Sequence, residues 1–126
     1  MSQIWLITGT SRGLGRSTAE AVLAAGHRLV ATARQPEQLG ALVTKYGDRV
    51  SPFALDVTDP SGAQAAVEHA VKTFGRLDVV VNNAGYGDTA SVEDVTLKDF
   101  RAQIDTNFYG TVYMTKAALP VMRQQG

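Results

Sequence analysis

Three glycines between residues 9 and 15 form the part of this sequence best suited to hold a ligand. They follow a short apolar run, precede a segment of helical period, and lie in the stretch Thr8-Gly9-Thr10-Ser11-Arg12-Gly13-Leu14-Gly15. Glycines permit a tight turn and a close approach of the backbone, and the N–H groups of a first helical turn attract negative charge. A turn that only connects a strand to a helix needs fewer glycines. The pattern therefore predicts a site for the pyrophosphate of a dinucleotide.

Three further stretches occur in the order and spacing of one enzyme family. They are Asp56-Val57, Asn82-Asn83-Ala84-Gly85 and Asn107. Together with the Thr-Gly-x-x-x-Gly-x-Gly spacing of the glycine-rich turn, they make the whole chain resemble the N-terminal half of a short-chain dehydrogenase/reductase. The resemblance implies a Rossmann-type fold and hydride transfer between a nicotinamide cofactor and a carbonyl or alcohol substrate.

The resemblance also implies roles for individual residues. In the family, the aspartate at the position of Asp56 bonds the adenine amino group. The asparagine at the position of Asn107 bonds a water that links the catalytic lysine to solvent, as a proton relay. We expect the cofactor to contact residues from four segments, namely Gly9, Thr10, Ser11, Arg12, Gly13, Leu14 and Gly15, then Arg34, then Asp56 and Val57, then Asn83, Ala84 and Gly85.

Each of these polar residues also has a purely structural interpretation. Asp56 could form an Asx turn before the helix that starts at Pro60. The amides of Asn82 and Asn83 could brace neighbouring strand ends, and Asn107 could satisfy a hydrogen-bond network on the inner side of a helix.

The end of the second strand indicates which nicotinamide cofactor binds. Enzymes that prefer NAD usually carry an acidic residue there, which binds the ribose 2′-hydroxyl. This chain reads Ala31-Thr32-Ala33-Arg34 instead, and Arg12 lies in the glycine-rich turn. A guanidinium suits a 2′-phosphate, so the sequence predicts NADP(H) in preference to NAD(H). The alternative is that Arg34 is a solvated surface cation.

The family's catalytic serine, tyrosine and lysine are not found in these 126 residues. Its tyrosine and lysine are spaced Tyr-x-x-x-Lys, and none of the four tyrosines here has a lysine four positions later. Tyr113 and Lys116 are three apart and lie too early in the chain, so we do not expect them to be catalytic. Positioned acid–base groups contribute about 10²–10⁴-fold to rate, so we expect the chain by itself to be inactive.

Strands and helices alternate along the chain and predict a single α/β domain over residues 1–126. Continuous apolar runs at 3–8, 28–33, 49–55 and 77–82 are typical of parallel strands covered on both faces. Helical segments follow each run, with Asp59 and Thr96 as N-caps and Gly75 as a terminator. We predict a doubly wound parallel sheet of strand order 3-2-1-4 that stops after four strands and four helices.

The fourth helix and fourth strand are the expected contact surfaces. An inward stripe is predicted from the helical spacing of Phe100, Ile104, Phe108, Thr111, Thr115 and Leu119. The apolar strand edge at 79–81 lacks a further neighbour and invites pairing. We expect a homo-oligomer that forms through this helix and this edge. A long loop is expected from Gly85 to Val95, and its residues from Gly85 to Asp94, including Tyr86, could line one wall of a substrate site.

Composition narrows the classes of partner. Twelve basic and twelve acidic residues give a net charge of zero, which disfavours nucleic acid. No cysteine is present, and His27 and His69 have no companions that suggest a metal site. The apolar runs are too short for a membrane helix, and no signal peptide is recognised, so we expect a cytoplasmic protein.

Two other hypotheses compete with an NADP(H)-dependent oxidoreductase represented by its cofactor-binding half. One is a non-catalytic nucleotide-binding module that acts as a sensor. The other is an assembly fragment that binds no nucleotide. A reading frame that continued into a serine and a Tyr-x-x-x-Lys would favour the enzyme, and NADPH titration would separate the third hypothesis from the other two.

Overall fold

The computed structural model describes residues 2–87 and 89–126 and contains a four-stranded parallel sheet. The strand order is β3-β2-β1-β4, as predicted. Each predicted strand is present to within two residues at either end. The strands are β1 (Ile4–Ile7), β2 (Arg28–Ala33), β3 (Val50–Ala54) and β4 (Val79–Val81).

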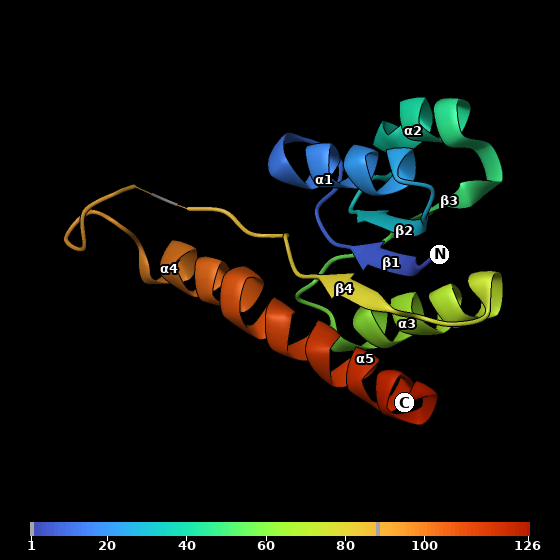
Figure 1. Ribbon diagram of the computed structural model, residues 1–126. Helices are drawn as coiled ribbons and strands as arrows, with labels where there is room; N and C mark the ends of the chain where they lie inside the picture. Colours follow the sequence, from blue (N-terminus) through green and yellow to red (C-terminus); the bar gives the residue numbers. More distant parts are fainter. Residues whose placement is uncertain (1, 88) are drawn as a thin grey trace.

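Helices cover both faces of the sheet (Figure 1). One face carries α1 (Gly13–Ala24) and α2 (Gly40–Tyr46), which a short 3₁₀ turn, η1 (Pro36–Leu39), connects to β2. The other face carries α3 (Pro60–Phe74) and α5 (Gly110–Gln125). A second short turn, η2 (Gly47–Arg49), leads into β3. This layering is the doubly wound arrangement that right-handed crossovers produce.

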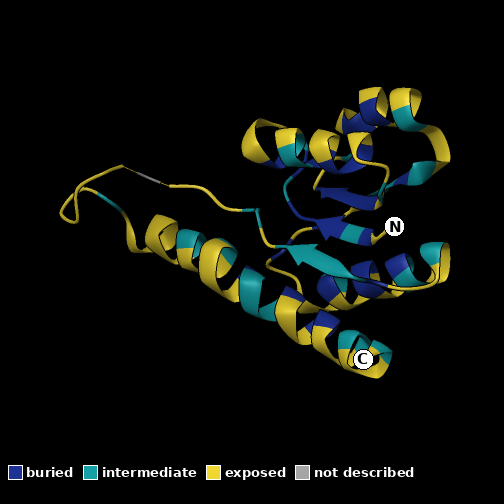
Figure 2. Ribbon diagram, in the orientation of Figure 1, coloured by how far each residue is buried: buried dark blue, intermediate teal, exposed yellow. Residues whose placement is uncertain are grey.

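Two apolar clusters fill the space between the sheet and its helices (Figure 2). Leu23 of α1 and Leu42 of α2 pack on Leu29 on one face. On the opposite face, Val67 of α3 and Met114 of α5 pack on Leu6. Strand residues therefore alternate between the clusters, because successive side chains of a strand point to opposite faces.

Local signals set the ends of α3. The Asp59 carboxylate accepts a hydrogen bond from the Ser61 N–H at 3.0 Å, and Pro60 occupies the first turn. The Ser61 hydroxyl and the Gly62 N–H lower the pKa of Asp59. Gly75 ends the helix in the left-handed region at φ 89°. These are the N-cap and C-cap preferences used to predict the helix.

The fourth predicted helix is continuous but contains a π-helical turn. It begins as α4 (Leu97–Ile104), where Thr96 caps the Asp99 N–H at 3.1 Å, and passes through η3 (Asp105–Tyr109) into α5. Figure 1 shows it as one long element beneath β4. A π turn adds a residue to the helical repeat and therefore rotates the sequence pattern across it.

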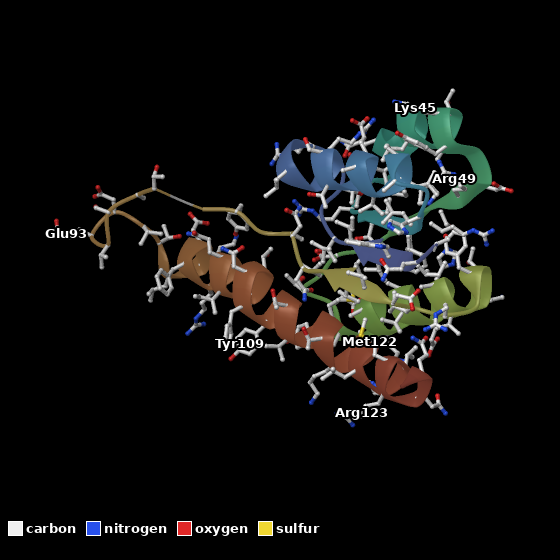
Figure 3. The ribbon with its side chains drawn as sticks, viewed as in Figure 1. Lys45, Arg49, Glu93, Tyr109, Met122 and Arg123 are labelled. Carbon is white, nitrogen blue, oxygen red and sulfur yellow. The ribbon has the colours of Figure 1, made fainter. Side chains whose placement is uncertain are left out.

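The predicted inward stripe of this helix is wrong. Phe100 is 52% exposed, Phe108 is 59% exposed and Leu119 is 42% exposed. The buried face instead consists of Gly110, Met114, Ala117 and Ala118. Small residues let α5 approach α3 closely, and the larger apolar side chains are left on the opposite side. Figure 3 shows Tyr109 projecting away from the sheet, whereas Met122 lies on the sheet side.

Among the described residues, strand β4 pairs with β1 on one side and with no strand on the other. Two side chains hold the segment that leads into it. Asp78 accepts a hydrogen bond from the Ile4 N–H at 2.8 Å. Gln125 of α5 donates to the Leu77 carbonyl at 2.6 Å and accepts from its N–H at 2.9 Å. The predicted unpaired edge at residues 79–81 is therefore present.

No helix among residues 2–87 and 89–126 combines the length and the apolar character needed to cross a membrane.

Candidate cofactor site

The glycine-rich turn leaves β1 and enters α1 at the carboxyl edge of the sheet. Thr10 ties it to β2, because its N–H and its hydroxyl both donate to the Thr32 carbonyl, at 3.1 and 3.0 Å. Gly9 has φ 68° and lies so close to Ala84 that a Cβ would be 3.0 Å from that Cα. A Cβ on Gly15 would collide with the Gly9 carbonyl oxygen and the Asn83 amide. The turn therefore requires glycine at both positions.

A reciprocal pair of side chains fixes the turn against the end of β4. The Asn83 Nδ2 donates to the carbonyls of Thr8 and Gly9, at 3.1 and 3.0 Å. The Thr8 hydroxyl accepts from the N–H groups of Asn83 and Ala84, at 3.0 and 2.9 Å. The bracing interpretation of Asn83 thus describes its side chain, while the residue also lines the pocket described below.

The first turn of α1 offers hydrogen-bond donors to a ligand. Arg12 occupies the N-cap with extended backbone and makes no side-chain cap, and the first turn contains no acidic residue. The first N–H groups of a helix have no partner within the helix, and the helix dipole adds positive potential there. An anion fits at this position without a competing carboxylate.

Two arginines flank this turn. Arg12 and Arg34 are both exposed, and neither forms an ion pair or hydrogen bond through its side chain within the described ranges 2–87 and 89–126. Arg34 follows β2 directly, so it lies at the same edge of the sheet as the turn. Their guanidinium groups are therefore available to a ligand.

Asp56 lies beyond the end of β3 and its neighbours hold it in place. Its Oδ1 accepts from the N–H of Thr58 at 3.0 Å and from the hydroxyl of Thr58 at 2.7 Å. Leu55 and Val57, on either side of it, are buried. The carboxylate thus forms the Asx turn weighed from the sequence and at the same time borders the pocket.

A pocket of about 1440 Å³ runs along the carboxyl ends of the strands. This volume exceeds the roughly 300–1,000 Å³ of common small-molecule sites and suits an extended dinucleotide. Twelve of the fourteen residues expected at the site line it: Gly9, Ser11, Arg12, Gly13, Leu14, Gly15, Arg34, Asp56, Val57, Asn83, Ala84 and Gly85.

The other two expected residues, Thr10 and Asn107, do not line the pocket. The Thr10 side chain is fully buried and bonds β2, so it supports the turn from beneath. Leu14, in contrast, is 75% exposed at the pocket, where its apolar surface is free to pack on a ligand.

Comparison with known proteins identifies the family. The family model for short chain dehydrogenase matches residues 3–126. The chain belongs to the short-chain dehydrogenase family. Oxidoreductase BOA17 of Botryotinia fuckeliana is 56% identical over 126 residues, which cover 99% of this chain and 46% of that protein.

Solved structures agree with this assignment. A short-chain dehydrogenase from Streptomyces avermitilis matches with a TM-score of 0.94 and 38% identity, over 99% of this chain and 46% of that one. A 3-ketoacyl-(acyl-carrier-protein) reductase from Brucella melitensis, complexed with NADH, matches with a TM-score of 0.92 and 29% identity, over 98% and 51%. This short-chain dehydrogenase chain spans about half the length of these relatives.

Members of the family are oxidoreductases that bind a nicotinamide cofactor. The residues of this chain fit such a group. Gly9 and Gly15 keep the backbone close where a Cβ would intrude, the first turn of α1 supplies N–H donors, and the two arginines supply positive charge. These features match the phosphates of a dinucleotide.

Asn107 holds the loop that follows β4. Its Oδ1 accepts from the Tyr86 N–H at 2.9 Å, and its Nδ2 donates to the Tyr86 carbonyl at 2.6 Å. Gly85 permits this contact, since a Cβ there would lie 2.8 Å from the Asn107 Oδ1. Asn107 is exposed and lies within η3, so its predicted place on a buried stripe is wrong. Its role in proton relay remains a prediction.

Tyr113 and Lys116 do not line the pocket, and the expectation that they are not catalytic stays a prediction. Tyr113 packs against the cluster between α3 and α5, and Lys116 is exposed on α5. The loop from Gly85 to Val95 contributes Gly85 and Tyr86 to the pocket. Asp88, within that loop, lies outside the described residues.

Sequence reasoning missed several lining residues. Gln35 and Gln38 follow Arg34, and their place just after a strand at the ligand edge could have indicated them. Thr58 could have been found from its spacing to Asp56, which suits an Asx turn. Ala102, Asp105 and Thr106 carried no such signal, because their approach depends on the direction of α4.

Proposed function

We propose that this chain is the cofactor-binding half of an NADP(H)-dependent oxidoreductase that interconverts a carbonyl and an alcohol. The observation that carries the cofactor preference is Arg34, an exposed cation at the end of β2, where an acidic residue would bind a 2′-hydroxyl. Arg12 lines the same pocket and supplies a second positive charge.

In this proposal, different residues of the pocket bind different parts of the cofactor. The first turn of α1 holds the pyrophosphate, Arg34 and Arg12 hold the 2′-phosphate, and Asp56 accepts a hydrogen bond from the adenine amino group. Gly85 and Tyr86, which follow β4, also line the pocket. The bound cofactor would supply the hydride, and the residues of this chain bind and orient it.

The chain by itself is proposed to bind cofactor without turnover. None of its tyrosines has a lysine four residues later, and Tyr113 packs away from the pocket. A non-catalytic nucleotide-binding module therefore stands as the second candidate. Turnover of a carbonyl substrate by the whole protein would favour the enzyme, and saturable binding without turnover would favour the module. A cytoplasmic location, supported by the absence of cysteine, stays a prediction.

A titration with NADPH and with NADH tests the cofactor preference. We expect NADPH to bind at least tenfold more tightly, because hydrogen bonds to charged groups contribute about 1.5–3 kcal/mol. Arg34→Ala should weaken NADPH binding about tenfold or more and leave NADH binding nearly unchanged.

Arg28→Ala is the matched control, since Arg28 is an exposed arginine at the opposite end of the same strand. It should change neither affinity. Equal affinity of the unaltered protein for NADPH and NADH would contradict the proposed cofactor, and absence of binding to either would favour the assembly fragment.

We further propose that a second copy of the chain covers the exposed apolar face of the long helix. This face is defined by Leu97, Phe100, Ile104, Phe108 and Leu119, which are between 41% and 78% exposed. A run of large apolar side chains along one helix face marks an interaction surface. The unpaired edge of β4 is the second surface of this proposal.

A further inference from the structure

Asp56 is the only acidic residue between β3 and α3 that lines the pocket. Thr58 forms hydrogen bonds with one of the two oxygens of its carboxylate. The Asp56 Oδ1 accepts two hydrogen bonds from Thr58, from the N–H at 3.0 Å and from the hydroxyl at 2.7 Å. Within residues 2–87 and 89–126, no hydrogen bond or ion pair reaches the Asp56 Oδ2. The carboxylate therefore keeps one acceptor oxygen for a ligand, and Thr58 fixes the rotation that decides where this oxygen points.

The backbone beneath this pair is held by packing. Leu55 is 5% exposed and Val57 is 9% exposed, so these two side chains anchor the segment in the apolar cluster. Gly110 of α5 lies against Val57, and a Cβ at Gly110 would be 2.8 Å from the Val57 Cγ2. Buried and exposed residues alternate from Leu55 to Thr58, which leaves Asp56 and Thr58 exposed beside the pocket.

We propose that Thr58 is a positioning residue that gives the pocket its selectivity for adenine over 6-oxopurines. A carboxylate oxygen can only accept a hydrogen bond, so it favours the 6-amino donor of adenine and disfavours the 6-carbonyl of hypoxanthine. This preference requires that the oxygen stay in one place. The Thr58 hydroxyl adds to the constraint that the Thr58 N–H provides, because it bonds the same Oδ1 at 2.7 Å and is the shorter of the two hydrogen bonds.

The inference rests on the proposed function, which places the adenine at Asp56. A purely structural alternative is that Thr58 only completes the turn that leads into α3. The two differ in what Thr58→Val does. Loss of a structural turn weakens every ligand of the pocket by the same factor, whereas loss of positioning lowers the discrimination between bases and leaves the discrimination at the 2′-phosphate intact.

The experiment compares three reduced cofactors: NADPH, its hypoxanthine analogue and NADH. Dissociation constants are measured by fluorescence titration for the unaltered protein and for Thr58→Val, Thr58→Ser, Thr58→Ala and Asp56→Asn. The unaltered protein is expected to bind NADPH about tenfold more tightly than the hypoxanthine analogue. Thr58→Val and Thr58→Ala should lower this ratio to about threefold or less, and Thr58→Ser should preserve it.

The ratio of NADPH to NADH affinity should stay the same in all three Thr58 variants. A melting curve of each variant checks that it is folded, which the exposure of Thr58 favours. A base ratio unchanged in Thr58→Val and Thr58→Ala but lowered in Asp56→Asn would overturn the inference and leave the proposed function standing. Absence of any base preference in the unaltered protein, or no effect of Asp56→Asn, would overturn the placement of the adenine and the inference with it.

Discussion

The segment from β1 to α3 and the segment from β4 to α5 place their large apolar side chains differently. In the first, Leu23, Leu29 and Leu42 are buried between the sheet and its helices, and Leu14 at the pocket is the main exception. In the second, Phe100 is 52% exposed and Phe108 is 59% exposed, and much of the ribbon of their long helix is coloured as exposed in Figure 2. The cluster under α1 and α2 is built from buried residues of the first segment alone, whereas Met114, Ala117 and Ala118 of the second segment complete the cluster on the other face and leave the large side chains of their helix exposed.

The two segments meet at both ends of the sheet through polar contacts. At the carboxyl end, Asn83 bonds the carbonyls of Thr8 and Gly9 beneath the ligand turn. At the amino end, Asp78 bonds the Ile4 N–H. The cofactor pocket is therefore lined mainly by the first segment and depends on contacts from the second.

The largest expected effect is on the free energy of unfolding, which should fall much more when a buried apolar residue is truncated than when an exposed one is. Leu29→Ala, in the centre of the sheet, should lower the free energy of unfolding by about 2–5 kcal/mol, because it leaves a cavity in a closed cluster. Phe108→Ala, on the exposed apolar face, should change it by less than about 0.5 kcal/mol. Urea unfolding at submicromolar protein concentration, where copies dissociate, measures both. Comparable losses at the two positions would contradict the comparison.

The second prediction concerns the contact between the segments at the ligand turn. Gly15→Ala should lower the free energy of unfolding by about 1–3 kcal/mol and weaken NADPH binding, because the added Cβ meets the Gly9 carbonyl and the Asn83 amide.

Gly40→Ala is the control for Gly15→Ala. Gly40 has φ −55° and nothing within 4 Å of an added Cβ, so this change should be neutral or stabilise by about 0.4–1 kcal/mol. Unfolding midpoints and NADPH titration test both variants. If Gly15→Ala left the stability unaltered, the turn would be able to move away from the Gly9 carbonyl and the Asn83 amide without loss of stability, which would contradict the prediction.

The first segment was also the more predictable one, for physical reasons. Its strands are apolar runs and its helix ends use local caps such as Asp59 and Gly75, so neighbouring residues carry the information. The glycine-rich turn and Arg34 were likewise found from their places beside a strand end. The hydrogen bonds that Asn83 and Asn107 make reach residues 21–75 positions away, and no local pattern indicates such pairs.

In the second segment, the buried face of the long helix was predicted wrongly. Two faces of this helix carry apolar residues, one small and one large, and spacing alone favoured the face with Phe100 and Phe108. Packing selected the small face, because Gly110 and Ala117 let α5 lie close to its neighbours. The π turn at η3 then shifted the repeat between α4 and α5.

The third prediction tests what covers the exposed apolar face. Sedimentation velocity at micromolar concentration should show a dimer or larger assembly. The double variant Ile104→Ser with Phe108→Ser should weaken self-association at least tenfold, since central apolar interface residues contribute 1 kcal/mol or more each. Val92→Ser is the control, because Val92 is 92% exposed in the loop before α4 and lies off this face. A monomer at all concentrations would contradict the proposed second copy.

The smallest expected effect concerns pH and the contact between the segments at the amino end. Burial acts most strongly on Asp78 and raises its pKa, but the Ile4 N–H and the Arg76 guanidinium, 2.7 Å away, together hold the pKa below its usual value. A carboxylate whose pKa is lower in the folded state stabilises the protein above its unfolded pKa. This stabilisation is lost as the pH falls through the folded pKa.

Asp78→Asn should therefore destabilise the protein at pH 7, by at most about 1 kcal/mol because Arg76 is half exposed. The difference from the unaltered protein should shrink as the pH falls below the usual aspartate value of about 3.9. Asp48→Asn, at an exposed position in η2, is the control and should follow the unaltered protein throughout. Urea unfolding between pH 7 and about pH 3 measures these differences. A constant difference across that range would mean that Asp78 stabilises the contact through its shape and not through its charge.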